Sequence, residues 1–349
     1  MDISAKTAIV YEPETQTVLF EKDADAQRLI ASTTKIMTAL IVLENCKLDD
    51  VVDITWEQAI VEGSSAYLKP GESYTVEQLL YGMMLVSGND AATALAEHTA
   101  GSMEAFAALM NAKCVELGLS NTNFANSHGL DAPDHYSTAY DLAVIAAAAM
   151  ENEKFCEIFS SRSYDVNDMT YVNHNKLLYL YEWCTGGKTG YTKAAGRSLV
   201  SCAERDGMRL ICVTITAPDD WNDHQRLYDW VYENYAYVPA LTEKIERLAV
   251  ISGTSEFVRL TSSEDGFLVK ASSEIRREVR LPQFVFAPVR LGESAGSVSV
   301  YADGELVGEA KISYAQLVLL DKNNIFTPWE RFKRAWSFSS RYGVYYPAF

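Results

Sequence analysis

The sequence lacks long apolar runs, paired-cysteine motifs and excess positive charge, and each absence excludes a class of protein. No stretch reaches the roughly 18–20 uninterrupted apolar residues that a membrane-spanning helix needs. The six cysteines form no C-x-x-C pair and no Cys/His spacing suited to zinc, which predicts buried free thiols and no metal site. A formal net charge of -17 argues against binding to nucleic acid phosphates.

The composition that is present is ordinary for a globular protein. The chain has 349 residues, of which 48% are hydrophobic and 22% charged, enough for two domains and a sizeable core. Its first residues, "MDISAKTAIVYEPET", lack the basic and apolar regions of a leader peptide. We therefore expect a cytoplasmic protein, or one whose sequence begins after a removed leader. If a leader has been removed, one or two disulfides are an alternative to free thiols.

Turn residues and hydrophobic periodicity divide the chain into a mixed first part and an all-β second part. After about residue 240 the runs become short, alternating and separated by turn residues, which predicts a small all-β domain. The predicted domains are 1–243, 244–322 and a tail at 323–349. The elements expected in the first part are hairpins over 7–20 and 198–218, and helices over 32–44, 75–118 with a break at 87–89, 138–150 and 224–235.

The tail at 323–349 is basic and aromatic in an acidic protein. Phe326, Trp329, Phe332 and Trp336 follow helical spacing, with cationic residues nearby. This pattern predicts an amphipathic helix, which would lie in a membrane interface or dock on the β domain. The sequence leaves both alternatives open.

The segment "LIASTTKIMTAL", residues 29–40, begins an apolar helix with a serine and a lysine three positions apart. Positions i and i+3 of a helix face the same way, so Ser32 and Lys35 are expected to meet. A desolvated lysine loses pKa and can take the proton of a serine nucleophile. Ser32 is also expected to cap the start of this helix, and for the pair alone the alternative is such a cap with an exposed lysine.

A second polar element interrupts "LLYGMMLVSGNDAATALAE". Ser87 and Asn89 stand two residues apart in a short break between helical runs, where a hydroxyl and an amide can both point into one cleft. The serine could relay a proton, and the amide could hold a substrate carbonyl and orient the lysine. By itself the segment is equally a turn that caps the next helix.

The third element lies in "EWCTGGKTGYTKAAGRSLV". Lys188 offers a cation and Thr189 a hydroxyl to a carboxylate. Gly190 lets a substrate backbone lie close along a strand edge. Taken alone, the segment could also be a glycine-rich turn.

Together, S-x-x-K, S-x-N and K-T-G in this chain order are the signature of penicillin-binding proteins and serine β-lactamases. The stretches "ASTTKIMTAL", "GSSAYLKPGESYTVEQLLYGMMLVSGNDAATALAEH", "NFANSHGLDAPDHYSTAYDLA" and "TGGKTGYTKAAGRSLV" resemble the low-molecular-mass penicillin-binding proteins that act as D-alanyl-D-alanine carboxypeptidases. This resemblance spans about residues 5–240. It implies an α+β fold: a penicillin-binding/serine β-lactamase-like domain, with an antiparallel sheet flanked by helices, then a small all-β domain and a C-terminal amphipathic helix.

The resemblance also implies roles for the matching residues, without a metal or cofactor. Ser32 would be the acylated nucleophile and Lys35 its base, while Ser87 and Asn89 would assist proton transfer and positioning. The substrate-binding residues would be Lys188, Thr189, Gly190 and Tyr191, with the backbone N–H groups of Ser32 and Tyr191 forming the oxyanion hole.

One departure from the family concerns an arginine that some members place after the next strand to help bind the carboxylate. Here that region reads "APDDWNDHQR", with acids at the expected place and Arg226 as the nearest candidate. Among the histidines, no pattern joins His128, His135 or His224 to Ser32 as a hydrolase triad, and we expect no G-x-S-x-G nucleophile elbow.

The function implied by the resemblance is removal of the terminal D-alanine from peptidoglycan stem peptides through a Ser32 acyl-enzyme. The partners would be peptides ending in D-Ala-D-Ala, β-lactams as inhibitors and, through the tail, a membrane surface. The location would be the cell envelope, peripheral at the outer face of the cytoplasmic membrane, with a leader absent from this sequence. A serine β-lactamase is one alternative, but the loop "LSNTNFANSHGL" has no glutamate to activate deacylating water. A catalytically idle peptidoglycan-binding protein is the other.

Overall fold

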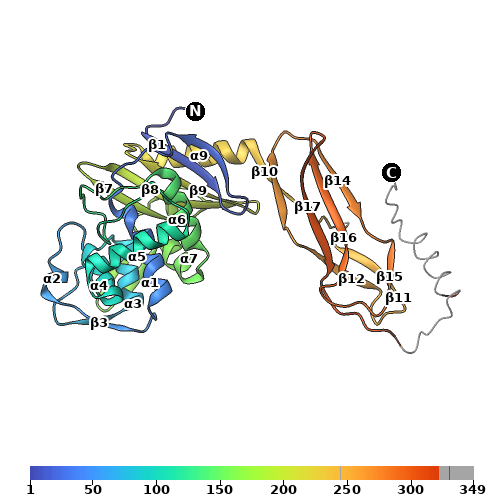
Figure 1. Cartoon of the computed structure of the whole chain (residues 1–349), viewed down its shortest axis with the longest axis horizontal. Helices are drawn as coiled ribbons and strands as arrows, with labels where there is room; N and C mark the ends of the chain where they lie inside the picture. The colour runs from blue at the N-terminus through green and yellow to red at the C-terminus, as the bar shows by residue number, and fades with distance from the viewer. Residues whose placement is uncertain (244, 322–329, 331–349) are drawn as a thin grey trace. The chain divides into compact units, whose positions relative to one another are not determined.

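The computed structural model describes residues 1–243, 245–321 and 330 (Figure 1). The chain forms two compact units, Met1–Tyr232 and a second that begins at Glu233. The boundary predicted at residues 243 and 244 therefore lies inside the second unit, and the roles assigned to the domains stay predictions. The predicted tail helix lies outside the described residues, apart from Glu330.

The first unit is built on a five-stranded antiparallel sheet in the order β2-β1-β9-β8-β7. Both predicted hairpins are confirmed, because β1 pairs with β2 and β8 with β9 in antiparallel register. Strand β7 is one of the two edge strands and pairs only with β8 within this sheet. The strands are β1 (Thr7–Glu12), β2 (Thr17–Lys22), β7 (Cys184–Thr192), β8 (Gly196–Arg205) and β9 (Met208–Ile215).

Helices cover both faces of this sheet (Figure 1). On one face, Val200 and Cys202 pack into the core that the helical cluster shares with the sheet. On the other, Ser201 and Thr214 bond to His224 of α9. The helices are η1 (Ala31–Thr34), α1 (Lys35–Asn45), α2 (Trp56–Ala59), α3 (Val76–Leu85), α4 (Asn89–Ala100), α5 (Met103–Glu116), α6 (Ala139–Met150), α7 (Glu153–Ser160), α8 (Leu177–Leu180) and α9 (Asp220–Asn234).

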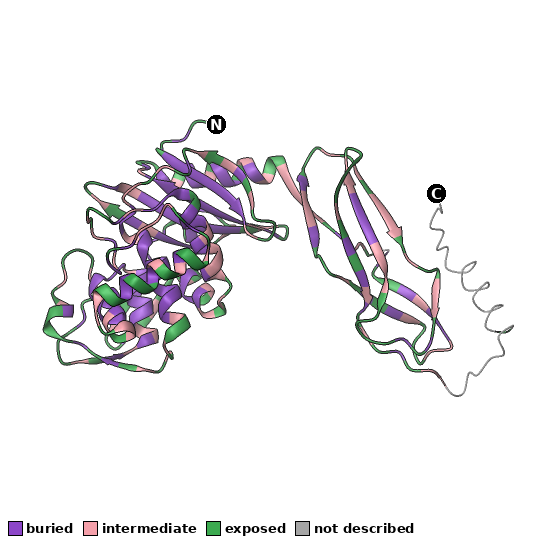
Figure 2. Ribbon diagram, in the orientation of Figure 1, coloured by how far each residue is buried: buried purple, intermediate pink, exposed green. Residues whose placement is uncertain are grey.

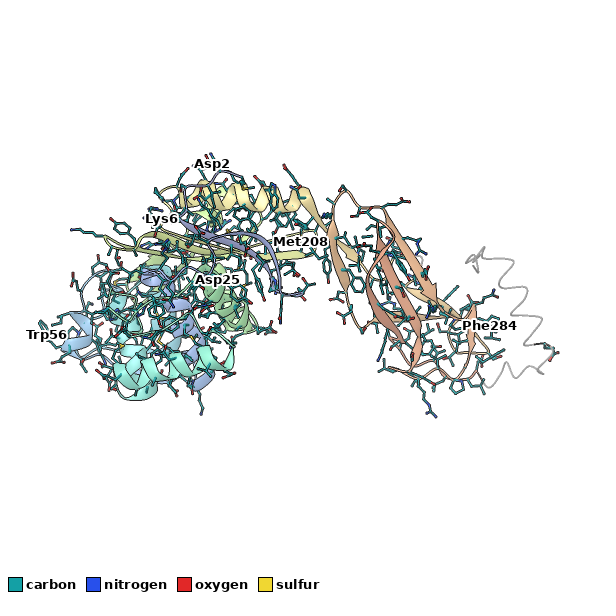
Figure 3. All side chains as sticks on the ribbon, turned by 45° about the horizontal axis from the view of Figure 1, so that its top comes forward. Asp2, Lys6, Asp25, Trp56, Met208 and Phe284 are labelled. Carbon is teal, nitrogen blue, oxygen red and sulfur yellow. The ribbon has the colours of Figure 1, made fainter. Side chains whose placement is uncertain are left out.

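Two short strand pairs complete the first unit: β3 (Val51–Asp53) with β4 (Ser73–Thr75), and β5 (Ser163–Val166) with β6 (Met169–Val172). The core lies between the sheet and the helical cluster, and buried residues follow α1, α3, α4 and the central strands (Figure 2). Trp56 of α2 is 64% exposed at the surface (Figure 3). The α+β class and the antiparallel sheet flanked by helices are confirmed.

Two local predictions were wrong. Ser32 does not cap α1: it lies inside the 3-10 turn η1, and Thr34 precedes the helix without a side-chain cap bond. The physical reason is that the Ser32 hydroxyl lies against the Lys35 amine instead of a backbone N–H. The helical segment after Asn89 also breaks between α4 and α5, because Gly101 adopts a φ of 82° at the end of α4.

Between Tyr235 and Asp321, the described part of the second unit contains β-strands and no helix, which agrees with the predicted all-β character. A six-stranded sheet in the order β14-β16-β17-β12-β11-β15 encloses a core that includes Val258, Val298 and Ile312, and β10 pairs with β13. The strands are β10 (Tyr235–Pro239), β11 (Arg247–Ile251), β12 (Phe257–Ser262), β13 (Gly266–Lys270), β14 (Ile275–Arg280), β15 (Phe284–Phe286), β16 (Ser294–Ala302) and β17 (Glu305–Tyr314).

All six cysteines lie in the described part of the chain and are free thiols, as the sequence predicts. Three of them, Cys114, Cys202 and Cys212, are buried. Among the described residues, no helix is both long enough and apolar enough to cross a bilayer.

Candidate active site

Ser32 sits on a strained turn at the start of α1. Ala31, directly before it, has a φ of 49°, a left-handed conformation that a residue with a Cβ rarely adopts. Two glycines make room for this turn. A Cβ on Gly129 would lie 1.9 Å from the Ala31 carbonyl oxygen, and one on Gly190 would lie 2.9 Å from the Ile30 carbonyl oxygen. Chain segments from a loop and from β7 therefore hold the serine turn from two sides.

Lys35 is fully buried, and its amine joins three segments of the chain. The Nζ atom donates to Ser32 Oγ at 2.9 Å, to Asn89 Oδ1 at 2.7 Å and to the His128 carbonyl oxygen at 2.7 Å. A protonated lysine has three N–H donors, so these partners use all of them. A neutral amine would keep two donors and present its lone pair to the Ser32 hydroxyl. The geometry thus suits a general base.

The electrostatic surroundings favour that neutral form. Burial lowers the pKa of Lys35 well below its ordinary value, and the nearby Lys188 lowers the pKa further. Asp90 acts in the opposite direction and raises the pKa of Lys35. Because the lowering causes prevail, Lys35 gives up its proton more readily than an exposed lysine does.

Ser87 and Asn89 stand at the junction of α3 and α4. Ser87 has a φ of 62°, and Asn89 is the first residue of α4. The Asn89 amide is fixed from both ends, since Oδ1 accepts from Lys35 and Nδ2 donates to the Glu62 carbonyl oxygen at 2.6 Å. Next to it, Asp90 accepts from the Ala66 backbone N–H at 2.8 Å. The asparagine therefore orients the lysine.

Lys188 lies on edge strand β7, and its amine contacts Ser87 at the junction of α3 and α4. Its Nζ donates to Ser87 Oγ at 3.0 Å and to the Thr189 carbonyl oxygen at 2.8 Å. Only 1% of Lys188 is exposed, and burial lowers its pKa to about 7. The structure thus joins all three sequence elements: Ser32 and Lys35 to Asn89, and Lys188 to Ser87.

A cleft of about 650 Å³ opens onto this constellation. Lys35, Asn89 and Lys188 lie buried behind its wall. The predicted residues that line it are Ser32, Ser87, Thr189, Gly190 and Tyr191. The lining residues that the sequence analysis did not single out include Ser64, Asn173, His174, Lys176, Arg197, Asp220 and Trp221.

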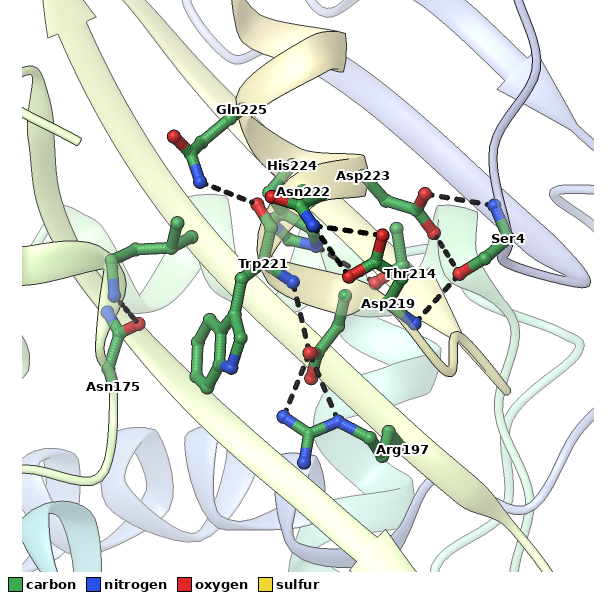
Figure 4. A network of polar contacts seen from close by, with 12 residues as sticks. Ser4, Asn175, Arg197, Thr214, Asp219, Trp221, Asn222, Asp223, His224 and Gln225 are labelled. Carbon is green, nitrogen blue, oxygen red and sulfur yellow. Dashed lines mark hydrogen bonds and ion pairs between the residues drawn. The ribbon is translucent and has the colours of Figure 1, made fainter. Parts of the chain in front are cut away.

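Arg197 is the clearest of the residues that sequence reasoning missed. It lies on β8 directly opposite Tyr191, and its Nη2 and Nε atoms donate to Asp220 Oδ1 at 2.8 and 3.1 Å (Figure 4). The hairpin that follows K-T-G was the available signal, because antiparallel pairing returns a residue of "GRSLV" to the level of Tyr191. By contrast, Arg226 is exposed on α9 and does not line the cleft.

The histidines serve structural bonds. His135 accepts from the Ala125 N–H through Nδ1 at 3.1 Å, so its Nε2 carries the proton shared with Thr34 Oγ1 at 2.8 Å. His224 is buried between Ser201 and Thr214. No cluster of three or more His, Cys, Asp or Glu side chains suited to a metal occurs within residues 1–243, 245–321 and 330.

One G-x-S-x-G sequence does occur in the chain, at Gly292–Gly296, and suggests a second nucleophilic serine. Its Ser294 is the first residue of β16, in an antiparallel sheet of the second unit. A nucleophile elbow needs a strand-to-helix turn, and Ser294 instead begins a strand of an antiparallel sheet, so this motif is no nucleophile elbow.

Comparison with known proteins agrees with the geometry. A sequence profile described as D-alanyl-D-alanine carboxypeptidase, of the S11 peptidases, matches residues 1–219. The D-alanyl-D-alanine carboxypeptidase DacF of Bacillus subtilis is 33% identical over 328 residues, which cover 88% of this chain and 84% of DacF. DacB2 of Mycobacterium tuberculosis is 38% identical over 241 residues, 66% of this chain and 82% of DacB2.

Solved structures agree in fold. Penicillin-binding protein 5 from Haemophilus influenzae superimposes with a TM-score of 0.71 at 29% identity, over 91% of this chain and 98% of that one. A mutant of the Streptomyces K15 DD-transpeptidase superimposes with a TM-score of 0.65 at 34% identity, over 66% of this chain and 99% of that one.

Proposed function

The chain belongs to the D-alanyl-D-alanine carboxypeptidase family of S11 serine peptidases, and we propose that it releases the terminal D-alanine from peptidoglycan stem peptides through a Ser32 acyl-enzyme. The observation that carries this proposal is the Lys35 amine. It lies within hydrogen-bond distance of both Ser32 Oγ and Asn89 Oδ1, at the wall of the one cleft that Ser87 and Thr189 also line.

The first half of the reaction forms the acyl-enzyme. Neutral Lys35 takes the Ser32 proton as Oγ attacks the carbonyl carbon of the penultimate D-alanine. The backbone N–H groups of Ser32 and Tyr191 stabilise the oxyanion. The proton passes through Ser87 to the leaving amine, and the C–N bond breaks to free D-alanine. Lys188 and Thr189 face the terminal carboxylate, and Gly190 lets the peptide lie along β7.

The second half clears the enzyme. Water attacks the ester carbonyl, Lys35 accepts a water proton and Ser32 regains its hydrogen as the shortened peptide leaves. A β-lactam acylates Ser32 in the same way but is cleared slowly. The loop over residues 119–130 accepts a hydrogen bond from Lys35 through the His128 carbonyl oxygen and contains no glutamate to activate water. Slow clearance separates this enzyme from a β-lactamase.

All the residues with proposed roles lie in the unit Met1–Tyr232. We therefore assign the chemistry to the predicted catalytic domain and no catalytic role to the β domain.

Labelling with a fluorescent penicillin, followed by a denaturing gel, tests the proposal together with D-alanine release from a peptide ending in D-Ala-D-Ala. Wild type should be labelled persistently and should release D-alanine. Ser32→Ala should lose both by orders of magnitude, because the covalent route is gone. Ser294→Ala, from the G-x-S-x-G sequence, is the matched control and should behave as wild type.

Three results would contradict the proposal. Normal D-alanine release by Ser32→Ala would remove the nucleophile assignment. A label that forms and disappears within minutes would indicate a β-lactamase, and a wild-type protein that neither labels nor cleaves would be an idle binder.

The substrate lies in the cell wall, so we further propose an extracytoplasmic enzyme held at the outer face of the cytoplasmic membrane by the tail at 323–349. The aromatic and basic composition of that tail supports the proposal. The full chain should sediment with vesicles containing anionic phospholipid, whereas a chain ending at residue 321 should not. Equal sedimentation of the two would refute the membrane role of the tail.

A further inference from the structure

The proposed substrate ends in a carboxylate, and the cleft needs a cation that keeps its charge at every working pH. Lys188 meets this need poorly. Its Nζ already donates to Ser87 and Thr189, and burial lowers its pKa to about 7, so near neutrality much of it carries no charge. The question of which residue supplies the lasting charge rests on the function proposed above.

Arg197 has the position and the chemistry for this task. It lies opposite Tyr191 in the β7–β8 register, and Leu199 lies opposite Thr189. Side chains alternate along a strand, so Arg197, Tyr191 and Thr189 project from the same face of the sheet. All three line the cleft. A guanidinium stays protonated throughout the accessible pH range.

The surroundings of Arg197 hold its guanidinium in one orientation. Nε and Nη2 both donate to a single oxygen, Asp220 Oδ1, which also accepts the Trp221 backbone N–H at 3.0 Å. The guanidinium carbon lies 5.4 Å from the Trp221 ring centroid (Figure 4). The Asp220 side chain is only 2% exposed, whereas that of Arg197 is 41% exposed. Three of five N–H donors thus remain for a ligand on the exposed side.

We propose that Arg197 binds the C-terminal carboxylate of the peptide, with Asp220 as the residue that positions the guanidinium and Trp221 as the ring beneath it. The arrangement takes the place of the arginine expected after β9, where this chain has acids. Asp220 stands in that acidic segment and is itself the partner of Arg197, so the departure from the family pattern and the relocated cation are two parts of one arrangement.

The other cations near the cleft are weaker candidates. Arg226 does not line the cleft. Lys176 lines it but is exposed, and an ammonium offers a point charge in place of the planar fork that matches a carboxylate.

The test compares two peptides that differ only at the C-terminus, one ending in D-Ala-D-Ala and one in D-Ala-D-alaninamide. The ratio of their kcat/KM values measures carboxylate recognition on one preparation, whatever fraction of it is folded. Arg197→Gln should lower that ratio about ten- to hundredfold through the carboxylate peptide alone, as expected for losing a charge-assisted hydrogen bond. Arg197→Lys should fall between wild type and Arg197→Gln. Acylation by benzylpenicillin and by its methyl ester gives a second such ratio.

Arg226→Gln removes the same charge from an exposed site on α9 and should leave both ratios at the wild-type value. An unchanged ratio in Arg197→Gln would overturn the proposal, as would an equal loss in Arg226→Gln. Failure of the underlying function looks different, because wild type would then release D-alanine from neither peptide.

Discussion

The Nζ atom of Lys188 lies 3.0 Å from the Oγ atom of Ser87, a residue 101 positions earlier in the chain. This contact joins edge strand β7 to the junction of α3 and α4, at the cleft that Ser32 also lines. Both side chains are buried, and a buried polar group without a hydrogen-bond partner costs free energy. The Lys188 amine and the Ser87 hydroxyl avoid this cost by bonding to each other. The hydrogen bond fixes the Ser87 hydroxyl at the wall of the cleft, where the proposed proton relay would need it.

Ser87→Ala tests this relay. Removing the hydroxyl should lower kcat for D-alanine release about 10²- to 10⁴-fold, the usual contribution of a positioned proton donor, with a much smaller change in KM. Ser160→Ala is the matched control, since that exposed hydroxyl bonds only within α7. A change confined to KM would show that Ser87 only helps to bind the peptide.

The pH dependence of acylation should reveal the repulsion between the two buried lysines. Acylation needs neutral Lys35, so its rate rises with pH as Lys35 loses its proton. Burial and then the charge of Lys188 lower the pKa of Lys35. Lys188→Met removes that charge, so the pKa of Lys35 should rise. The rising limb of the plot of acylation rate against pH should then move to higher pH.

The position of the limb, read from penicillin labelling rates between pH 4 and 10, is the quantity to compare, because the height of the profile will also fall. Lys176→Met removes an exposed cation of the cleft wall and should leave the limb in place. An unchanged rising limb in Lys188→Met would mean that the charge of Lys188 does not lower the pKa of Lys35.

Short-range patterns in the sequence were enough to predict the two sheet hairpins and the contact between Ser32 and Lys35, whereas the α+β class and the meeting of the three site elements were implied by the resemblance to the penicillin-binding proteins. The i, i+3 spacing brought Ser32 next to Lys35, and turn chemistry at Arg205-Asp206-Gly207 gave the β8–β9 hairpin. Both features are determined by residues that are close to each other in the sequence.

The misses depend on contacts between distant residues. The strained turn at Ala31 exists because Gly129 packs on it, and no local signal in residues 29–40 announces that contact. Arg197 was missed for a similar reason: its partner Asp220 comes from the start of α9, and their bond depends on how that helix lies over the sheet.

Gly129 should be essential to the nucleophile turn. It has a φ of 88°, and a Cβ there would lie 1.9 Å from the Ala31 carbonyl oxygen and 2.9 Å from the Ser32 backbone nitrogen. Backbone atoms cannot yield as a flexible side chain does, so Gly129→Ala should displace Ser32 and abolish penicillin acylation.

Gly101→Ala separates this steric effect from backbone strain. Gly101 has a similar φ of 82°, but a Cβ there would meet open space at the end of α4. This change should cost about 1 kcal/mol of unfolding free energy and leave the acylation rate unchanged. Normal acylation by Gly129→Ala would show that the turn tolerates the shift.

Two buried histidines, His135 and His224, and the half-buried His128 should make the fold sensitive to acid. Burial lowers the pKa of His128 and of His224 to about 3 and that of His135 to about 4, from an ordinary value of 6.5. Between pH 6.5 and 4 the unfolded chain therefore binds protons that the folded chain does not. The free energy of unfolding should fall as pH falls through this window, by up to about 1.4 kcal/mol per pH unit for each histidine.

Urea unfolding at a series of pH values gives this slope. The slope of the unfolding free energy against pH measures how many more protons the unfolded chain binds than the folded chain. His224→Gln should reduce this number by up to one, whatever the change does to stability at pH 8. His98→Gln, exposed on α4, is the matched control and should keep the wild-type slope. If His224→Gln kept it as well, His224 would have to accept a proton inside the folded protein, which its bonds to Ser201 and Thr214 in a fully buried site oppose.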